Sequence, residues 1–455
     1  MKFKELFIED WTFDWEKIEK IPQFDKLAST QQSSVWHKEG NAKLHTILVV
    51  QEMHDILRDN KIEEGSENWI MCMMAALCHD LGKVETTKWS EEKQDWTTKN
   101  HGVVGERITR NLFYDEDIIQ REKVCYMVRH HMALHHVFDE DGEAKRKLVK
   151  LSHGIVPIRY MLYLNVADSK GSLNDIETEE KINTKYYKIS AYASVLNCFD
   201  KPYLYIAKDQ LIRDFIGDDS ELVNKTTDFC VYILCGFPGC GKSTYVDWFL
   251  SDKPVLSRDN IRCELGIGGA AFENNKKVVG TKAEENEVSE IFNSRMIGFC
   301  EEKISFVIDN TNLKYQYRKD YLLKIMKYNP KVKIIYIEAP DFINDCMERR
   351  KGQIDNSVYD RMNNNFDFPQ LYECDELVIY KEHKDNENET FTFTSNESPQ
   401  TLPIETRILN DLRVTRGAMI LDGYDCYDSC IKYMDDLIQK YEKTDFDEDT
   451  FKIGM

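Results

Sequence analysis

The feature that most constrains this chain is a glycine-rich stretch, GFPGCGKS, at residues 236–243. It matches the pattern G-x-x-x-x-G-K-[ST], in which glycines let backbone N–H groups turn toward phosphate oxygens. The apolar run FCVYILC precedes it, and a helix is expected to begin at Lys242. A strand, a phosphate loop and a helix in this order predict a nucleoside triphosphate site in an α/β domain with a parallel sheet.

Three stretches of different character divide the chain. Short apolar runs alternate with helical stretches over 228–380, which predicts an α/β domain with a parallel sheet. Residues 1–215 show apolar side chains at three- and four-residue spacing and few β-branched runs, which predicts an all-α domain. The polar stretch around 217–228 is the expected boundary. Residues 381–455 are acidic and are expected to form a small mixed or helical appendage.

The composition limits the classes of partner. Lys and Arg number 60 and Asp and Glu 80, so the formal net charge is −20, which argues against a protein that coats DNA without specificity. The 13 cysteines include no C-x-x-C pair. There is no signal-peptide pattern and no long apolar run, so we expect a cytoplasmic protein that does not bind a membrane.

The glycine-rich stretch carries the candidate donor site. Lys242 is expected to bridge the β and γ phosphates of ATP or another NTP, and Ser243 to bind Mg²⁺. The other residues of this stretch that are expected to bind the NTP are Gly236, Gly239, Cys240, Gly241 and Thr244. Cys240 is most simply a small filler.

Three later stretches supply candidate acceptor and lid residues. Asp259, in SRDNIR after the next strand, is placed to take a proton from an attacking hydroxyl, and Arg262 to hold an anionic acceptor. A helix-capping Asp with a surface Arg is the alternative. The DNTN stretch containing Thr311 supplies a metal-binding acid, acceptor contacts, or simply a turn. Arg349 and Arg350, in ERRKG, could close over the phosphates or form a solvated helix end.

Together, GFPGCGKST, SRDNIR, DNTNL and ERRKG resemble the 5′-hydroxyl polynucleotide kinase family of P-loop phosphotransferases. The resemblance implies that Asp259 activates the 5′-hydroxyl group and that Arg262 holds a phosphate of the acceptor. It further implies that Thr311 contacts the acceptor, and that Arg349 and Arg350 bind the donor phosphates.

The helical part holds a second candidate site, made of histidines and aspartates at helix ends. Its members are His45, His79, Asp80, His101, His130 or His131, and Asp168. Imidazole and carboxylate ligands together suit a transition metal such as Mn²⁺, Fe²⁺, Co²⁺ or Zn²⁺. Two such ions could hold a phosphoester and activate a water molecule. Each histidine taken alone is more often structural.

The order H…HD…H…H…D resembles the HD-domain phosphohydrolase superfamily, with HDLGK and LNVADSK as its more specific parts. The resemblance implies one metal on His45, His79, Asp80 and Asp168. Members with a second metal add two histidines, here His101 and either His130 or His131, and the usual spacing favours His131. Lys83 is a candidate phosphate contact.

An HD domain followed by a kinase domain resembles the bacterial and phage HD–kinase enzymes that heal RNA ends. The resemblance implies phosphorylation of a 5′-hydroxyl end and removal of a 2′,3′-cyclic or 2′-phosphate from the other end. It also implies RNA, or DNA, as substrate and a separate RNA ligase as partner. The alternatives are a small-molecule kinase fused to a nucleotide phosphohydrolase, and a regulatory module that only binds nucleotides. The oligomeric state is left open.

Overall fold

The structure is a computed structural model that describes most of the chain. The described residues are 1–33, 37–138, 143–172, 176–203, 208–217, 228–267, 272–273, 276–277, 280–382, 388–394, 432–436 and 439. Most of the expected boundary at 217–228, and most of the expected appendage at 381–455, lies outside these residues.

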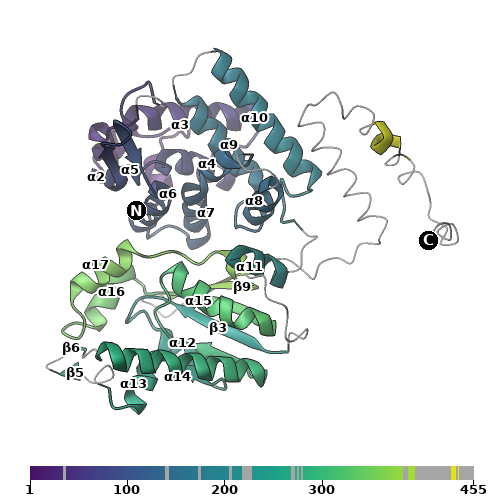
Figure 1. The fold of residues 1–455 in the computed structure, drawn as a ribbon. Coiled ribbons are helices and arrows are strands. Elements are labelled where there is room, and N and C mark those ends of the chain that lie inside the picture. The colour runs from purple at the N-terminus through teal and green to yellow at the C-terminus, as the bar shows by residue number, and fades with distance from the viewer. Residues whose placement is uncertain are drawn as a thin grey trace, which may run out of the picture.

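The first half of the chain is helical, as predicted (Figure 1). Five helices share one hydrophobic core: α3 (Ala42–Asp59), α4 (Glu67–Cys78), α6 (His101–Leu112), α7 (Ile118–His130) and α9 (Ile158–Lys170). Helix α4 is buried from Trp69 to its end because this part of its sequence, WIMCMMAALC, is apolar on every face. It therefore fixes the position of the histidine and aspartate that follow it.

Further elements surround these five helices. They are α1 (Trp15–Ile18), α2 (Pro22–Asp25), α5 (Lys83–Thr86), α8 (Glu143–Ser152), α10 (Ile176–Val195), α11 (Lys208–Ile216), and the strands β1 (Thr87–Ser90) and β2 (Asp95–Thr98). The two strands pair as an antiparallel hairpin, which the expectation of an all-α region missed. Four-residue strands are too short to give a clear alternating pattern in the sequence.

The second half is built on one six-stranded sheet with the order β10-β9-β8-β3-β7-β4. Its strands are β3 (Cys230–Cys235), β4 (Val255–Leu256), β7 (Phe306–Ile308), β8 (Lys331–Glu338), β9 (Glu376–Lys381) and β10 (Glu389–Thr394). All pairings are parallel except that of β10 with β9. The sheet thus extends beyond residue 380, where the kinase-like domain was expected to end.

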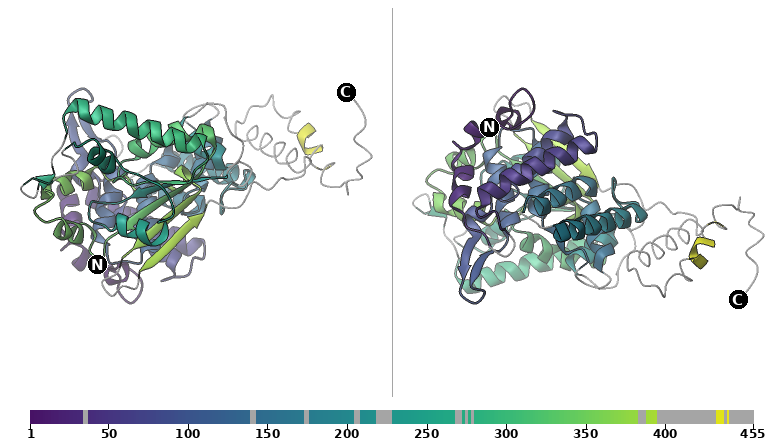
Figure 2. Two further views of the ribbon diagram at one scale, coloured as in Figure 1. Left: turned by 90° about the horizontal axis from the view of Figure 1, so that it is seen from below. Right: turned by 90° about the horizontal axis from the view of Figure 1, so that it is seen from above.

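Helices lie on both faces of this sheet (Figure 2). They are α12 (Lys242–Phe249), α13 (Arg258–Glu264), α14 (Lys282–Glu301), α15 (Tyr315–Ile325), α16 (Phe342–Arg349) and α17 (Asn356–Asn364). Because parallel strands end at the same edge, the loops that follow β3, β4, β7 and β8 meet there. A two-stranded pair, β5 (Phe272–Glu273) and β6 (Lys276–Lys277), lies outside the sheet.

The helical half packs directly on the sheet half. Arg121 of α7 makes two hydrogen bonds, of 3.1 and 2.8 Å, to the carboxylate of Glu338 at the end of β8, and both side chains are fully buried. The hydroxyl group of Tyr114 donates to the carbonyl of Ala339. A buried charge pair is tolerated only when its hydrogen bonds are satisfied, so this junction specifies one way of docking. Among the described residues, no helix combines the length and apolar character needed to cross a lipid bilayer.

Candidate active sites

A buried cluster of imidazoles and carboxylates lies in the helical half. Its members are His45 on α3, His79 and Asp80 after α4, His101 at the start of α6, His131 after α7, and Asp168 on α9. Each residue is at most 9% exposed. Four of the six stand at or beside a helix end, where the chain can turn several side chains toward one point.

The four imidazoles are oriented by their Nδ1 atoms, each of which faces an oxygen. Hydrogen bonds join Nδ1 to the carbonyls of Ala76 for His79 (2.8 Å), Thr98 for His101 (3.2 Å) and Val128 for His131 (2.7 Å), and the Glu39 carboxylate lies 3.0 Å from Nδ1 of His45 as its ion-pair partner. An Nδ1–H directed at an oxygen leaves the Nε2 lone pair available as a ligand. All four Nε2 atoms therefore point into the cluster as potential metal ligands.

The Nε2 atoms and carboxylates form two groups that meet at Asp80. In the first group, Asp168 Oδ1 lies 3.0 Å from His45 Nε2 and 3.5 Å from His79 Nε2. Asp80 Oδ2 lies 3.3 Å from the same His79 atom. His79 Nε2 is buried and has no hydrogen-bond partner among the described residues. A cation at this point would satisfy a nitrogen that is otherwise left unpaired.

The second group consists of Asp80, His101 and His131. The two Nε2 atoms of its histidines lie 3.0 Å apart, and Asp80 Oδ1 lies 3.7 Å from that of His101. Two lone pairs facing each other at this distance repel unless a cation or a proton lies between them. The two oxygens of Asp80 thus face different groups, and the donor set of each group fits a transition metal.

The electrostatics of the cluster favour positive charge near its carboxylates. Burial opposes protonation of His79, but Asp80 and Asp168 outweigh it and raise the pKa of His79 to about 10. Burial, together with the neighbouring His101, lowers the pKa of His131 to about 3, which keeps that imidazole a neutral ligand. A metal ion bound at His79 would therefore displace the proton of this imidazole, because only a neutral imidazole is a ligand.

The structure separates the two adjacent histidines that the sequence left as alternatives. His131 lies in the cluster, whereas the Nε2 of His130 lies 3.4 Å from the hydroxyl of Tyr372, which belongs to the sheet half. All six residues expected as HD metal ligands, with His131 as the fifth, are thus brought together.

Three further side chains border the cluster. Lys83 Nζ lies 2.7 Å from Asp80 Oδ2 and also donates to Gln32, so it stands where a phosphate oxygen would need a cation. His135 Nε2 lies 3.2 Å from Asp168 Oδ2. Sequence reasoning gave no role to His135 or to Glu39. Their contacts depend on tertiary packing, so no local pattern could have identified them.

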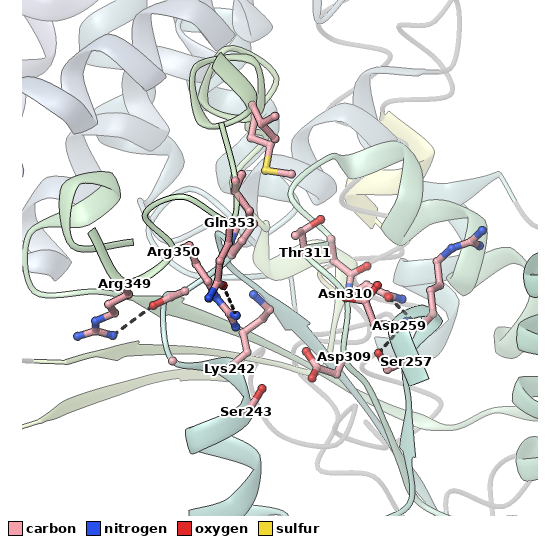
Figure 3. A pocket seen from close by; sticks show the side chains of 18 of the residues that line it. Lys242, Ser243, Ser257, Asp259, Asp309, Asn310, Thr311, Arg349, Arg350 and Gln353 are labelled. Atoms are coloured by element: carbon pink, nitrogen blue, oxygen red, sulfur yellow. Dashed lines mark hydrogen bonds between the residues drawn. The ribbon is translucent and has the colours of Figure 1, made fainter. Parts of the chain in front are cut away.

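The sheet half has a large cavity at the edge where its parallel strands end (Figure 3). Its volume is about 1530 Å³, above the range of about 300–1,000 Å³ usual for a site that holds one small ligand. It is lined by the loops after β3, β4 and β7 and by the segment that contains α16 and α17. There is room for a nucleotide and a second substrate together.

The phosphate loop forms one wall of this cavity. Gly239 and Gly241 have φ values of 85° and 102°, a region in which a side chain would be strained. Lys242 Nζ donates to the carbonyls of Gly236 (3.0 Å) and Phe237 (2.9 Å). Ser243 and Thr244 also line the cavity.

Two residues of this loop that were expected to bind the NTP do not line the cavity: Gly236 and Cys240. Cys240 is 1% exposed, and the Gly236 N–H donates to the carbonyl of Thr311 at 3.0 Å. Both residues support the shape of the loop, which agrees with the interpretation of Cys240 as a filler.

Asp259 and Arg262 lie side by side on α13. Arg262 donates to Asp259 Oδ1 at 2.6 Å and to both oxygens of Glu285, on α14, at 2.8 and 2.7 Å. The side chain of Asp259 is 54% exposed and lines the cavity. Nearby, burial raises the pKa of Asp309, and the cation of Lys242 opposes this shift. Glu285, which holds Arg262, was not identified from the sequence.

The expected lid arginines approach the phosphate loop from the other side. Arg349 donates to the carbonyl of Gly239 at 3.2 Å and to Glu382 at 2.8 Å, and Arg350 donates to Gln353 at 3.0 Å. Thr311 also lines the cavity. Altogether six cationic side chains and three acidic ones line it: Lys242, Arg258, Arg262, Arg349, Arg350 and Arg361 against Asp259, Asp309 and Asp355.

Two protein-family models match the chain. One is described as an AAA domain and matches residues 231–369, and the other as an HD domain and matches residues 44–153. Together with the geometry above, they show an HD domain that is followed along the chain by a P-loop AAA domain.

Similar proteins include the multifunctional CCA protein of Psychromonas ingrahamii, which is 28% identical over 157 residues, or 33% of this chain and 35% of that protein. The multifunctional CCA protein of Actinobacillus pleuropneumoniae is 36% identical over 68 residues, 15% of each chain. This chain thus spans about a third or less of these relatives. A solved structure described as a kinase from Chloroflexus aurantiacus is 16% identical, with a TM-score of 0.28 over 36% of this chain and 92% of that one.

Proposed function

We propose that this protein heals RNA ends with two separate sites. The P-loop site would transfer a phosphoryl group from an NTP to a 5′-hydroxyl end. The HD site would remove a 2′,3′-cyclic or 2′-phosphate from the opposite end. Phosphoryl addition and removal in one chain are productive together when they act on different ends of one polymer.

The charge of the kinase cavity carries this proposal. Six cationic side chains against three acidic ones line it, in a chain whose formal net charge is −20. A local excess of cations inside an acidic protein supports a polyanionic ligand, because each phosphate of a bound strand needs a partner. The volume of about 1530 Å³ supports an acceptor bound beside the NTP.

The roles of the kinase residues follow from where they lie. Asp259 would take the proton of the 5′-hydroxyl group while that oxygen attacks the γ-phosphorus, and the bond to the β–γ bridging oxygen breaks to release the nucleoside diphosphate. Lys242 would leave its two loop carbonyls for the phosphates of the donor. Ser243 and Asp309 would hold Mg²⁺, which neutralises the phosphate charge.

The HD residues suit hydrolysis of a phosphoester. The two groups that share Asp80 would hold one or two ions such as Mn²⁺, Fe²⁺, Co²⁺ or Zn²⁺, which lower the pKa of bound water. Lys83, buried beside Asp80, would bind a phosphate oxygen of the substrate. A separate RNA ligase would then seal the ends.

The test is an RNA that carries a 5′-hydroxyl and a 2′,3′-cyclic phosphate, incubated with ATP, Mg²⁺ and each transition metal in turn. We expect labelling of the 5′ end from γ-labelled ATP and loss of the cyclic phosphate. Phosphorylation of free nucleosides but not of oligonucleotides would instead support the small-molecule kinase. Nucleotide binding without either reaction would support a regulatory module.

A further inference from the structure

We infer that the ring of Tyr317 is the stacking surface for the 5′-terminal base of the polynucleotide acceptor, an inference that rests on the proposed kinase function. Tyr317 lies in the first turn of α15 and lines the cavity. Tyr317 is 49% exposed, so part of its surface is open to a ligand in the cavity. An exposed aromatic ring at a substrate cavity offers a flat surface on which a base can stack.

The order of the strands places Tyr317 on the acceptor side of the cavity. Strands β7 and β4 lie on one side of β3, and β8 lies on the other. Helix α15 follows β7 and Asp259 follows β4, whereas Arg349 follows β8. The phosphate loop after β3 therefore lies between the lid arginine and the side that holds both Asp259 and Tyr317. A hydroxyl group that reaches Asp259 brings its own nucleoside to that side.

The contacts of α15 explain why this ring and not its neighbour is available. Tyr321, one turn further on, is on the same helix face. Its hydroxyl accepts a hydrogen bond from Asn310 at 3.3 Å, and its ring packs 5.6 Å from that of Phe292. Asn310 in turn accepts from the backbone N–H of Arg258 at 3.3 Å. These contacts hold α15 against the loop after β7, so that Tyr317 stays exposed at the cavity.

The chemistry of the site suits an unpaired base. Aromatic side chains stack on the bases of single strands with little dependence on sequence, because every base has a flat face. The ammonium group of Lys314 lies 5.9 Å from the centre of the Tyr317 ring, where it adds positive charge beside a strand. The site would therefore bind 5′ ends whose terminal base is unpaired.

Steady-state kinetics of Tyr317→Ala test the inference on 5′-hydroxyl oligonucleotides. We expect the KM for the oligonucleotide to rise about 5- to 150-fold, the equivalent of about 1–3 kcal/mol of stacking. The KM for ATP and the kcat should stay unchanged, and Tyr317→Trp and Tyr317→Phe should keep the KM of the wild type. The matched control is Tyr187→Ala, since Tyr187 is 73% exposed and lies on α10 in the other half.

An acceptor whose 5′-terminal nucleotide lacks its base separates stacking from a general loss of structure. The wild type should bind this acceptor about as weakly as Tyr317→Ala binds the normal one, and the substitution should add no further loss. Three results for Tyr317→Ala would overturn the stacking inference but not the proposed kinase function. They are an unchanged KM for the oligonucleotide, an equal rise in KM on the abasic acceptor, and a raised KM for ATP. A wild-type protein that labels no 5′-hydroxyl oligonucleotide would overturn the proposed function as well.

Discussion

The side chains of the two candidate sites differ in burial and in the groups that hold them in place. In the HD cluster, the side chains of His45, His79 and Asp80 are at most 2% exposed, and backbone or carboxylate oxygens fix the imidazoles. In the kinase cavity, the side chain of Asp259 is 54% exposed. There the charged groups bond to one another or to the phosphate loop, as Lys242 and Arg262 do.

This contrast shows what each ligand must do on binding. The HD ligands already converge, so a metal ion needs no large movement of their side chains and displaces only bound protons. In the cavity, a substrate phosphate must first displace a carboxylate or a carbonyl from each cation. Substitutions around the HD cluster should therefore act through metal affinity, and those around the cavity through substrate affinity and the phosphoryl-transfer rate.

The largest expected effect is on the rate of phosphoryl transfer. Asp259→Asn removes the proton acceptor, so the kinase kcat should fall by about 10²- to 10⁴-fold, with the HD activity unchanged. Radiolabelling of a 5′-hydroxyl oligonucleotide measures it. Asp252→Asn is the matched control, because Asp252 is exposed in the same domain. Retained kinase activity in Asp259→Asn would show that another group accepts the proton.

The junction between the two halves gives the next effect. Arg121→Met leaves the buried carboxylate of Glu338 without its cation and leaves Glu122 paired with Arg110 alone, so the free energy of unfolding should fall by about 3–5 kcal/mol. Arg295→Met breaks an exposed pair with Glu264 and should cost at most about 1 kcal/mol. Chemical denaturation compares the two variants. Equal losses would mean that the buried pair does not hold the halves together.

Metal affinity should respond to a carboxylate that lies beside the two groups that share Asp80. Glu39 lies 3.0 Å from His45 Nδ1 and also accepts from His37. Burial opposes its charge, but these two imidazoles hold the pKa of Glu39 well below its usual value. Glu39→Gln should weaken metal binding about 10- to 100-fold, measured by titration of the metal-free protein. Unchanged affinity would show that the orientation of His45 does not depend on this carboxylate.

The smallest effect should come from the partner of Arg262. Glu285→Gln removes a charge that holds this guanidinium from α14. Because the pair is partly exposed, the KM for the oligonucleotide should change by no more than about fivefold. The kcat should remain that of the wild type. A loss of kcat comparable with that of Asp259→Asn would mean that Glu285 itself takes part in the transfer.

Much of this organisation could be predicted from the sequence, and the exceptions share a physical cause. The helices and parallel strands follow from apolar spacing, and the HD ligands from histidines and aspartates at helix ends. The edge strand β10, with its alternating ETFTFT, lies in the stretch predicted as an appendage, because a polar break precedes it. Glu39 and Glu285 act only through contacts that form in the folded protein, with His45 and Arg262 respectively. No local sequence pattern therefore marks them.

The most direct measurement follows both reactions on one RNA that carries a 5′-hydroxyl and a 2′,3′-cyclic phosphate. The wild type should process both ends. Asp80→Ala should keep 5′ phosphorylation and lose removal of the cyclic phosphate, and Asp259→Ala should do the reverse. Loss of both activities in an Asp80→Ala protein that is still folded, as judged by circular dichroism, would contradict the assignment of the two reactions to separate sites.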